Sequence, residues 1–269
     1  MADFYHEQLD LSSSYLKHNV FADIKEMREY YDCISYSCFF CLRPGTIAFT
    51  NYASYIYTAM SGTLGSISEL FRIGRMNDAI VLTRKFYDDV MMDLYLEVIR
   101  KEKCKSIVHS DVEEVNEWLT KKIRMPRTSK ILKLLETSDC CKELYPYFGW
   151  KTNLQKSREF LDDSVHGNLY YRVLLNCKSI YLDDRETQLN NIQTILHQIV
   201  QVHIAYTFYL NPIYLMGSTY IDCLECNETP PEESKYWIAP FAQKAFNKFI
   251  KSDKVLSQFI QMNCPLEIG

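Results

Sequence analysis

Residues 187–221 read TQLNNIQTILHQIVQVHIAYTFYLNPIYLMGSTYI, a stretch that contains no Asp, Glu, Lys or Arg. Glutamine, histidine and asparagine side chains and Pro212 interrupt it, so it holds no unbroken apolar run of about 20 residues, the length that spans a bilayer. A central helix around residues 188–210, covered by protein on nearly every side, explains the missing charges better than a membrane span does. The polar side chains of such a helix then need hydrogen-bond partners inside the protein.

The composition of the whole chain also favours helices. Only 8 glycines and 8 prolines occur in 269 residues, which is few for an architecture of many strands and tight turns. Hydrophobic residues make up 47% of the chain, enough for a sizeable core. We therefore predict an all-α fold, a multi-helix bundle formed by one domain over residues 1–269, with the N-terminal helices of residues 1–45 at its periphery.

Breaks in the sequence mark the ends of the other predicted helices. The RIGRMN segment, residues 72–77, is typical of a turn, and Asn77 is a plausible N-cap for the helix that follows. Gly167 interrupts another helix. The predicted helices cover residues 20–42, 46–73, 78–101, 111–122, 128–137, 153–166 and 168–177, with a last helix or pair of helices over 238–262.

Charge and cysteine usage exclude some classes of function. The net charge of −4 argues against a general nucleic-acid coat, and the basic stretch of residues 121–133 is interpreted as a solvated helix end and loop. The first residues, MADFYHEQLD, do not resemble a signal peptide, so we expect a cytoplasmic protein with mostly reduced cysteines. Two CxxC pairs, Cys38–Cys41 and Cys223–Cys226, lie far apart in the chain, and we expect no metal and no cofactor.

The predicted helix of residues 78–101 carries an arginine on its apolar face. At 100° per residue, Arg84 lies about 40° from Ile80, within the apolar arc. We therefore expect Arg84 to face inward or into a cleft, and Asp88, one turn on, can pair with it. Two interpretations remain open: an ion pair that ties this helix to a neighbour, or a guanidinium that binds an anion such as a phosphate.

The stretch LDDSVHGNLYYR, residues 161–172, contains the histidine of greatest interest. Arg158, Asp162 and His166 lie at positions i, i+4 and i+8, which form one column on a helix. An arginine and a histidine suffice to cleave a phosphodiester through attack by the ribose 2′-hydroxyl, without a metal. The alternative is that His166 caps the helix by bonding its last carbonyl groups before Gly167.

Sequence motifs of common enzyme classes are missing. The chain has no P-loop, no GxGxxG, no GxSxG and no HExxH. These absences argue against ordinary nucleotide-binding and dinucleotide-binding enzymes, α/β-hydrolases and zincins. His197 and His203, six residues apart, would lie on nearly opposite faces of one helix, so we interpret them as core histidines with polar partners.

Two motifs resemble a known group of proteins. The pattern G-x4-A-x2-L-x-R-x2-Y-D runs from Gly74 to Asp88, and S-x-H-G covers residues 164–167. Over residues 46–175 the chain resembles bacterial all-helical proteins grouped near the HEPN superfamily, found among abortive-infection and toxin–antitoxin proteins. The resemblance implies a helical bundle, frequent homodimers and, in active members, metal-independent RNA cleavage by an arginine and a histidine.

The resemblance also assigns roles to residues of this chain. His166 would be the acid or base, Arg84 and Arg158 would hold the scissile phosphate, and Asp162 would orient the histidine. Seven residues separate Arg158 from His166, one more than the family signature R-x4-6-H has, and Arg84 on the earlier helix could take the place of Arg158. The candidate substrate-binding residues are Asp88, Asn168 and Arg172.

The expected function follows from these assignments. We expect a defence or toxin-type protein that acts as an endoribonuclease, with RNA, a second copy of the chain and a protein from the same operon as its partners, and no contact with a membrane. The alternative is a non-catalytic helical adaptor subunit of a defence or toxin–antitoxin system.

Overall fold

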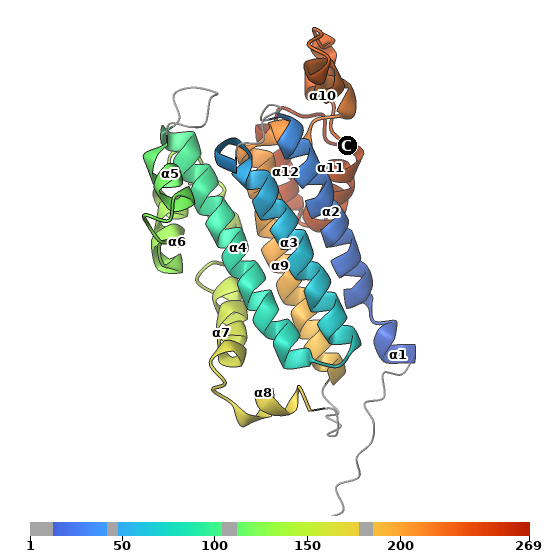
Figure 1. Ribbon diagram of the computed structural model, residues 1–269. Coiled ribbons are helices and arrows are strands. Elements are labelled where there is room, and N and C mark those ends of the chain that lie inside the picture. Colours follow the sequence, from blue (N-terminus) through green and yellow to red (C-terminus); the bar gives the residue numbers. More distant parts are fainter. Residues whose placement is uncertain (1–12, 42–47, 104–111, 178–184) are drawn as a thin grey trace, which may run out of the picture. The chain divides into compact units, whose positions relative to one another are not determined.

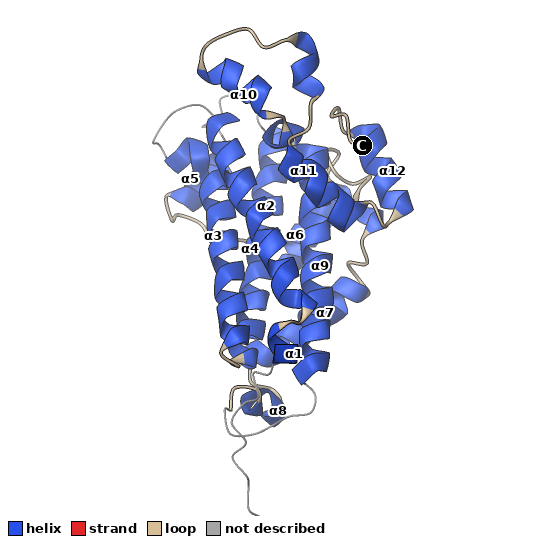
Figure 2. Cartoon of the chain, turned by 90° about the vertical axis from the view of Figure 1, so that its right-hand side faces the viewer, coloured by secondary structure: helices blue, strands red, loops and turns tan. Residues whose placement is uncertain are grey.

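The fold is all-helical in the part of the chain that the computed structural model describes, residues 13–41, 48–103, 112–177 and 185–269 (Figure 1). Figure 2 shows helices joined by loops, and no described residue belongs to a strand. Met216 and Ile238 form an isolated antiparallel bridge. The prediction of an all-α multi-helix bundle is confirmed.

Most observed helices match the predicted ranges closely. Thr128–Thr137, the helix α6, has the predicted bounds, because Pro126 and the turn after Thr137 bracket it. The others are α1 (Ser13–Leu16), α2 (Asn19–Cys41), α3 (Ala48–Arg72), α4 (Met76–Lys103), α5 (Glu113–Leu119), α7 (Asn153–Val165), α8 (Tyr170–Leu174), α9 (Arg185–Leu210), α10 (Ser218–Glu225), α11 (Pro240–Ala245) and α12 (Lys254–Asn263). Short 3-10 turns occur at Tyr145–Tyr147, Pro212–Leu215 and Glu232–Tyr236, and a π-helical segment at Phe246–Ile250.

The chain divides into two compact units. The first unit comprises the described residues within 1–28, 60–87 and 149–199, and the second comprises the other described residues. The helices α2, α3, α4 and α9 each contribute one part to the first unit and the other part to the second. A single domain over residues 1–269 stays a prediction.

The first unit is a bundle formed by parts of α2, α3, α4, α7 and α9. Polar side chains connect these helices: Asp23 accepts a hydrogen bond from Gln193 and pairs with His197, and Ser157 donates to Gln198. The apolar core lies between the helices, since a fully buried side chain gains most from leaving water. Its fully buried members include Val20, Ile24, Met27, Leu64, Ile67, Phe71, Ile80, Phe86, Leu161, Ile192 and Leu196.

The corner between α3 and α4 corrects the predicted start of α4. Gly74 has a φ of +76° and ends α3, with Gly74 N–H donating to Phe71 and Arg75 N–H donating to Leu70. These two bonds form a Schellman cap, which requires the left-handed conformation that glycine adopts at low cost. The helix α4 then begins at Met76, so the prediction of Asn77 as its N-cap is wrong, and Asn77 lies in its first turn.

The second part of α9, residues 200–210, is the buried helix that the uncharged stretch predicts. In residues 200–210 only Gln201 and Tyr209 are partly exposed, and every other residue is buried. In residues 185–199, by contrast, several uncharged polar side chains face solvent, so the prediction of burial on nearly every side is wrong for this part. Asparagine and threonine provide a solvated face there without a formal charge.

No described helix has the length and apolarity of a membrane span.

Candidate functional site

A three-residue ionic cluster joins α4 and α7 within the first unit. Arg84 Nε donates to Asp162 Oδ1 at 2.5 Å, and Arg158 Nε lies 3.5 Å from Asp162 Oδ2. One carboxylate therefore bridges two guanidinium groups that come from different helices. Because two cations meet one anion, these three side chains carry a formal charge of +1, which favours binding of an anion.

Arg84 faces inward, as its helical phase predicts. Its side chain is 13% exposed, and its guanidinium carbon lies 5.3 Å from the centre of the Tyr87 ring, a cation–π distance. The carboxylate that pairs with it is Asp162, which is 78 residues away in the chain. Asp88, the partner that the spacing along α4 allows, is exposed.

His166 stands at the end of the helix that carries Asp162 and Arg158. It is the C-cap residue of α7 and is exposed. At 1.5 Å of rise per residue, it lies about 6 Å along the axis from Asp162 and about 12 Å from Arg158. Along the predicted column, Arg158 and Asp162 therefore belong to the ionic cluster, and His166 lies at the exposed end of the same helix.

The end of α7 is capped without the side chain of His166. Gly167 has a φ of +60°, and Asn168 N–H donates to the carbonyl oxygen of Asp163 at 3.3 Å, the long bond of a Schellman cap. The Asn168 side chain adds a hydrogen bond to the Asp163 carboxylate at 3.0 Å. Backbone groups and Asn168 thus close this helix, which leaves the imidazole available for another role.

Arg172 and Asn168, two of the predicted substrate-binding residues, are engaged in local contacts. Arg172 is 5% exposed, stacks over the Phe160 ring at 4.0 Å and donates to Gln188 Oε1 at 3.2 Å. These contacts hold α8 against α7 and the first part of α9. The environment of Arg172 favours a structural role, and that of Asn168 favours capping.

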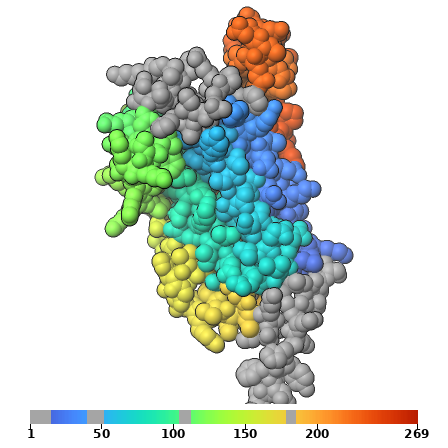
Figure 3. Space-filling model, viewed as in Figure 1, coloured from blue at the N-terminus to red at the C-terminus, as the bar shows by residue number. Residues whose placement is uncertain are grey.

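Exposed apolar side chains lie on both sides of His166 in the sequence. Tyr170 is 77% exposed, and the other members of this group, called the apolar surface below, are Val165, Leu169 and Val173. The yellow segment of Figure 3, which contains α7 and α8, forms part of the molecular surface. The sequence suggested a resumed helix here but did not indicate that apolar residues would remain in water, which is typical of a binding surface.

The second unit contains a different polar cluster, which is sealed from solvent. His203 Nδ1 lies 2.9 Å from the Tyr31 hydroxyl, and its Nε2 lies 2.8 Å from Asp93 Oδ2. Burial raises the pKa of Asp93, against the hydrogen bond and the charge of His203, which lower it. The interpretation of His203 as a core histidine is confirmed, whereas the same interpretation is wrong for His197, whose side chain is 34% exposed. Since these groups do not reach solvent, they stabilise the fold and cannot meet a substrate.

Candidate metal ligands do not come together in the described residues. No group of three or more His, Cys, Asp or Glu side chains there has an arrangement that could hold a metal ion. Cys38 is buried and Cys226 is exposed, while the side chain of Cys41 lies outside the described part. A site formed by both CxxC pairs is therefore not tested.

Comparison with known proteins found no matching family model, no matching curated protein and no matching solved structure. The functional assignment therefore rests on the side chains of this chain.

Proposed function

We propose that the chain is a metal-independent endoribonuclease of a defence or toxin-type system, resembling HEPN proteins. The observation that carries the proposal is that Arg84 and Arg158 converge on Asp162, in the same helical column that ends at the exposed His166. The two arginines offer cations for a phosphate, and His166 offers an imidazole for proton transfer. These are the groups that this reaction needs.

Arg84 and the three residues of the α7 column each have a defined role in the proposed reaction. His166, as a base, takes the proton from a ribose 2′-hydroxyl, whose oxygen attacks the adjacent phosphorus. The bond from phosphorus to the 5′-oxygen breaks, and this oxygen takes up a proton from water as it leaves. Arg84 and Arg158 stabilise the negative charge that develops on the phosphate oxygens. Asp162, which the sequence led us to expect beside the histidine, is instead assigned to positioning the two guanidinium groups that it contacts.

An RNA cleavage assay at excess chelator tests the proposal. Single-stranded RNA incubated with the purified full chain and EDTA should be cut to products with 2′,3′-cyclic phosphate and 5′-hydroxyl ends. The cyclic product follows from attack by the 2′-oxygen, and its ends are identified by mass spectrometry. Cleavage that requires an added divalent metal, or no cleavage of any single-stranded RNA, would contradict the proposal. The same preparation of a His166→Ala variant controls for contaminating nuclease.

The apolar surface formed by Val165, Leu169, Tyr170 and Val173 supports a second candidate, a non-catalytic adaptor subunit of such a system. Tyr170 and Val173 are well exposed, and exposed apolar patches of this kind mark protein interfaces. The partner would be the protein encoded by a neighbouring gene. A homodimer through the same surface stays a prediction, which the molar mass from light scattering checks.

Loss of the two exposed side chains should weaken this interaction. In a Tyr170→Ser/Val173→Ser variant, we expect the affinity for the co-expressed product of the neighbouring gene to fall about tenfold or more, the loss typical of interface anchors. Titration calorimetry with the purified partner measures the change. Val255→Ser, on the exposed face of α12, is the matched control. Equal affinity of the double variant and the control would exclude this surface as the binding site.

A further inference from the structure

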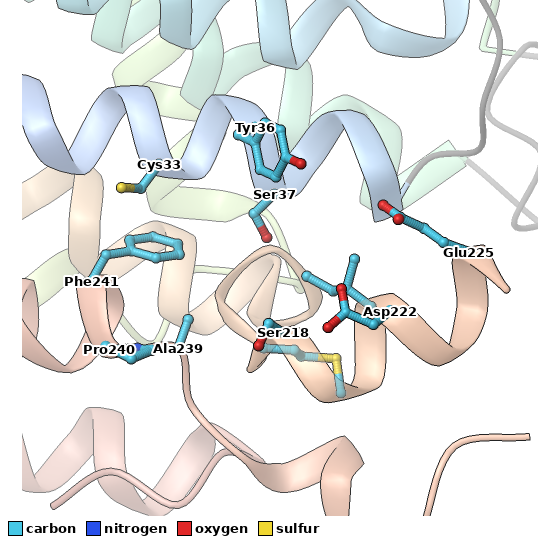
Figure 4. Close-up of a pocket in the computed structure, with 11 residues that line it drawn as sticks. Cys33, Tyr36, Ser37, Ser218, Asp222, Glu225, Ala239, Pro240 and Phe241 are labelled. Atoms are coloured by element: carbon cyan, nitrogen blue, oxygen red, sulfur yellow. The ribbon is translucent and has the colours of Figure 1, made fainter.

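The second unit contains a cavity that the proposed cleavage site does not use. Its volume is about 220 Å³, and α2, α10 and α11 supply most of its walls (Figure 4). A cavity of about 150 Å³ holds benzene, and drug-sized ligands occupy about 300–1,000 Å³. The volume therefore fits a small organic molecule rather than a nucleotide or a peptide segment.

A buried hydroxyl group points to a ligand in this cavity. Ser37 on α2 is 4% exposed, and its Oγ has no hydrogen-bond partner among the described residues. Figure 4 shows this hydroxyl directed from α2 toward the cavity. Ser35, two residues earlier, instead donates to the Ser54 carbonyl oxygen at 2.8 Å, as buried hydroxyl groups normally do. A polar group of a ligand would satisfy Ser37.

The walls of the cavity differ in polarity. Asp222 and Glu225 lie three residues apart on α10, so they share one face of that helix and border the cavity together. Phe241 and Met216 supply apolar surface. None of the described residues that line the cavity is a lysine, arginine or histidine. Two carboxylates beside an apolar wall suit a ligand with a cationic head and an apolar body.

We propose that this cavity binds a small primary amine with an apolar or aromatic body. The body packs against Phe241 and Met216, and the ammonium group pairs with Asp222 and Glu225. Ser37 Oγ accepts a third hydrogen bond from the ammonium group, which has three donors. The site is independent of the cluster of Arg84, Asp162 and Arg158, because all of its residues belong to the second unit.

Three probes that differ only in the polar head group test the proposal by calorimetry on the full chain. We expect saturable binding of 2-phenylethylamine, and no saturable binding of 3-phenylpropionate, because two carboxylates repel the anion. The neutral 2-phenylethanol should bind about tenfold or more weakly than the amine, since a hydrogen bond to a charged group contributes more than a neutral one. Equal affinity for the amine and the carboxylate, or no saturable binding of the amine, would overturn the proposal.

Variants of the wall residues place the binding in this cavity. Asp222→Asn/Glu225→Gln should weaken amine binding about tenfold or more, and Ser37→Ala should weaken it several-fold. Asp222 and Glu225 are exposed, so the double variant should fold normally. Glu233→Gln, an exposed carboxylate in the adjoining loop, is the matched control and should bind like the unmodified chain. Unchanged amine affinity in the double variant would also overturn the proposal.

Discussion

RNA cleavage is expected to fall about 10²–10⁴-fold when His166 is replaced with alanine, which is the contribution of a positioned acid or base. Alanine cannot take the proton from the 2′-hydroxyl, while Arg84 and Arg158 still hold the phosphate. The single-turnover rate constant on a short RNA measures the loss. The free energy of unfolding should stay within about 0.5 kcal/mol of its original value, because His166 is exposed and Gly167 and Asn168 cap the helix.

The control for this prediction is a second exposed position on the same helix. Lys156 precedes Arg158 by two residues, which places it about 160° around α7, away from the proposed site. Lys156→Ala removes a positive charge from the helix and should leave the rate constant nearly unchanged. If His166→Ala, like Lys156→Ala, cleaved RNA at nearly the rate of the unmodified chain, the imidazole would not be the acid or base. Large losses of equal size in both variants would instead indicate a general effect on RNA binding, which also contradicts the prediction.

Periodicity predicted the orientation of Arg84 but not its pairing with Asp162. The spacing of residues along one helix fixes the direction of each side chain relative to the apolar face of that helix. The inward position of Arg84 could therefore be predicted from its place four residues after Ile80. Asp162 is on another helix, and the sequence does not state which helices pack together. Asp93 shows the same limit: the sequence does not mark this acidic residue as buried, yet it is 2% exposed, because α4 is covered on more than one side there.

The cavity of the second unit could not be predicted from sequence at all. Ser37 lies on α2, far in the chain from Asp222 on α10 and Phe241 on α11, and each residue is ordinary in its own helix. A serine within an apolar helix usually bonds a nearby carbonyl oxygen, so its sequence context gave no sign of an unsatisfied hydroxyl. Only the packed structure reveals which buried polar group lacks a partner.

The second unit contains a buried ion pair whose two charges depend on each other. Glu97 accepts hydrogen bonds from Arg100 Nε at 3.0 Å and from Asn211 Nδ2 at 2.7 Å, and Arg100 also donates to Asn211. The side chains of Glu97 and Arg100 are 3% and 10% exposed. Burial lowers the pKa of Arg100, but the carboxylate of Glu97 outweighs this effect, and the pKa is raised overall. The arginine is therefore charged, and Glu97 neutralises it.

Replacing Glu97 with glutamine should lower the free energy of unfolding by about 3–5 kcal/mol, because it leaves the guanidinium of Arg100 buried without a counter-charge. Urea unfolding followed by circular dichroism measures the change. The same substitution at Glu113, an exposed residue of α5, should cost less than about 0.5 kcal/mol. A Glu97→Leu/Arg100→Met variant should recover much of the loss, since it removes both charges and retains apolar volume. A cost for Glu97→Gln no larger than that for Glu113→Gln would contradict the charge pairing.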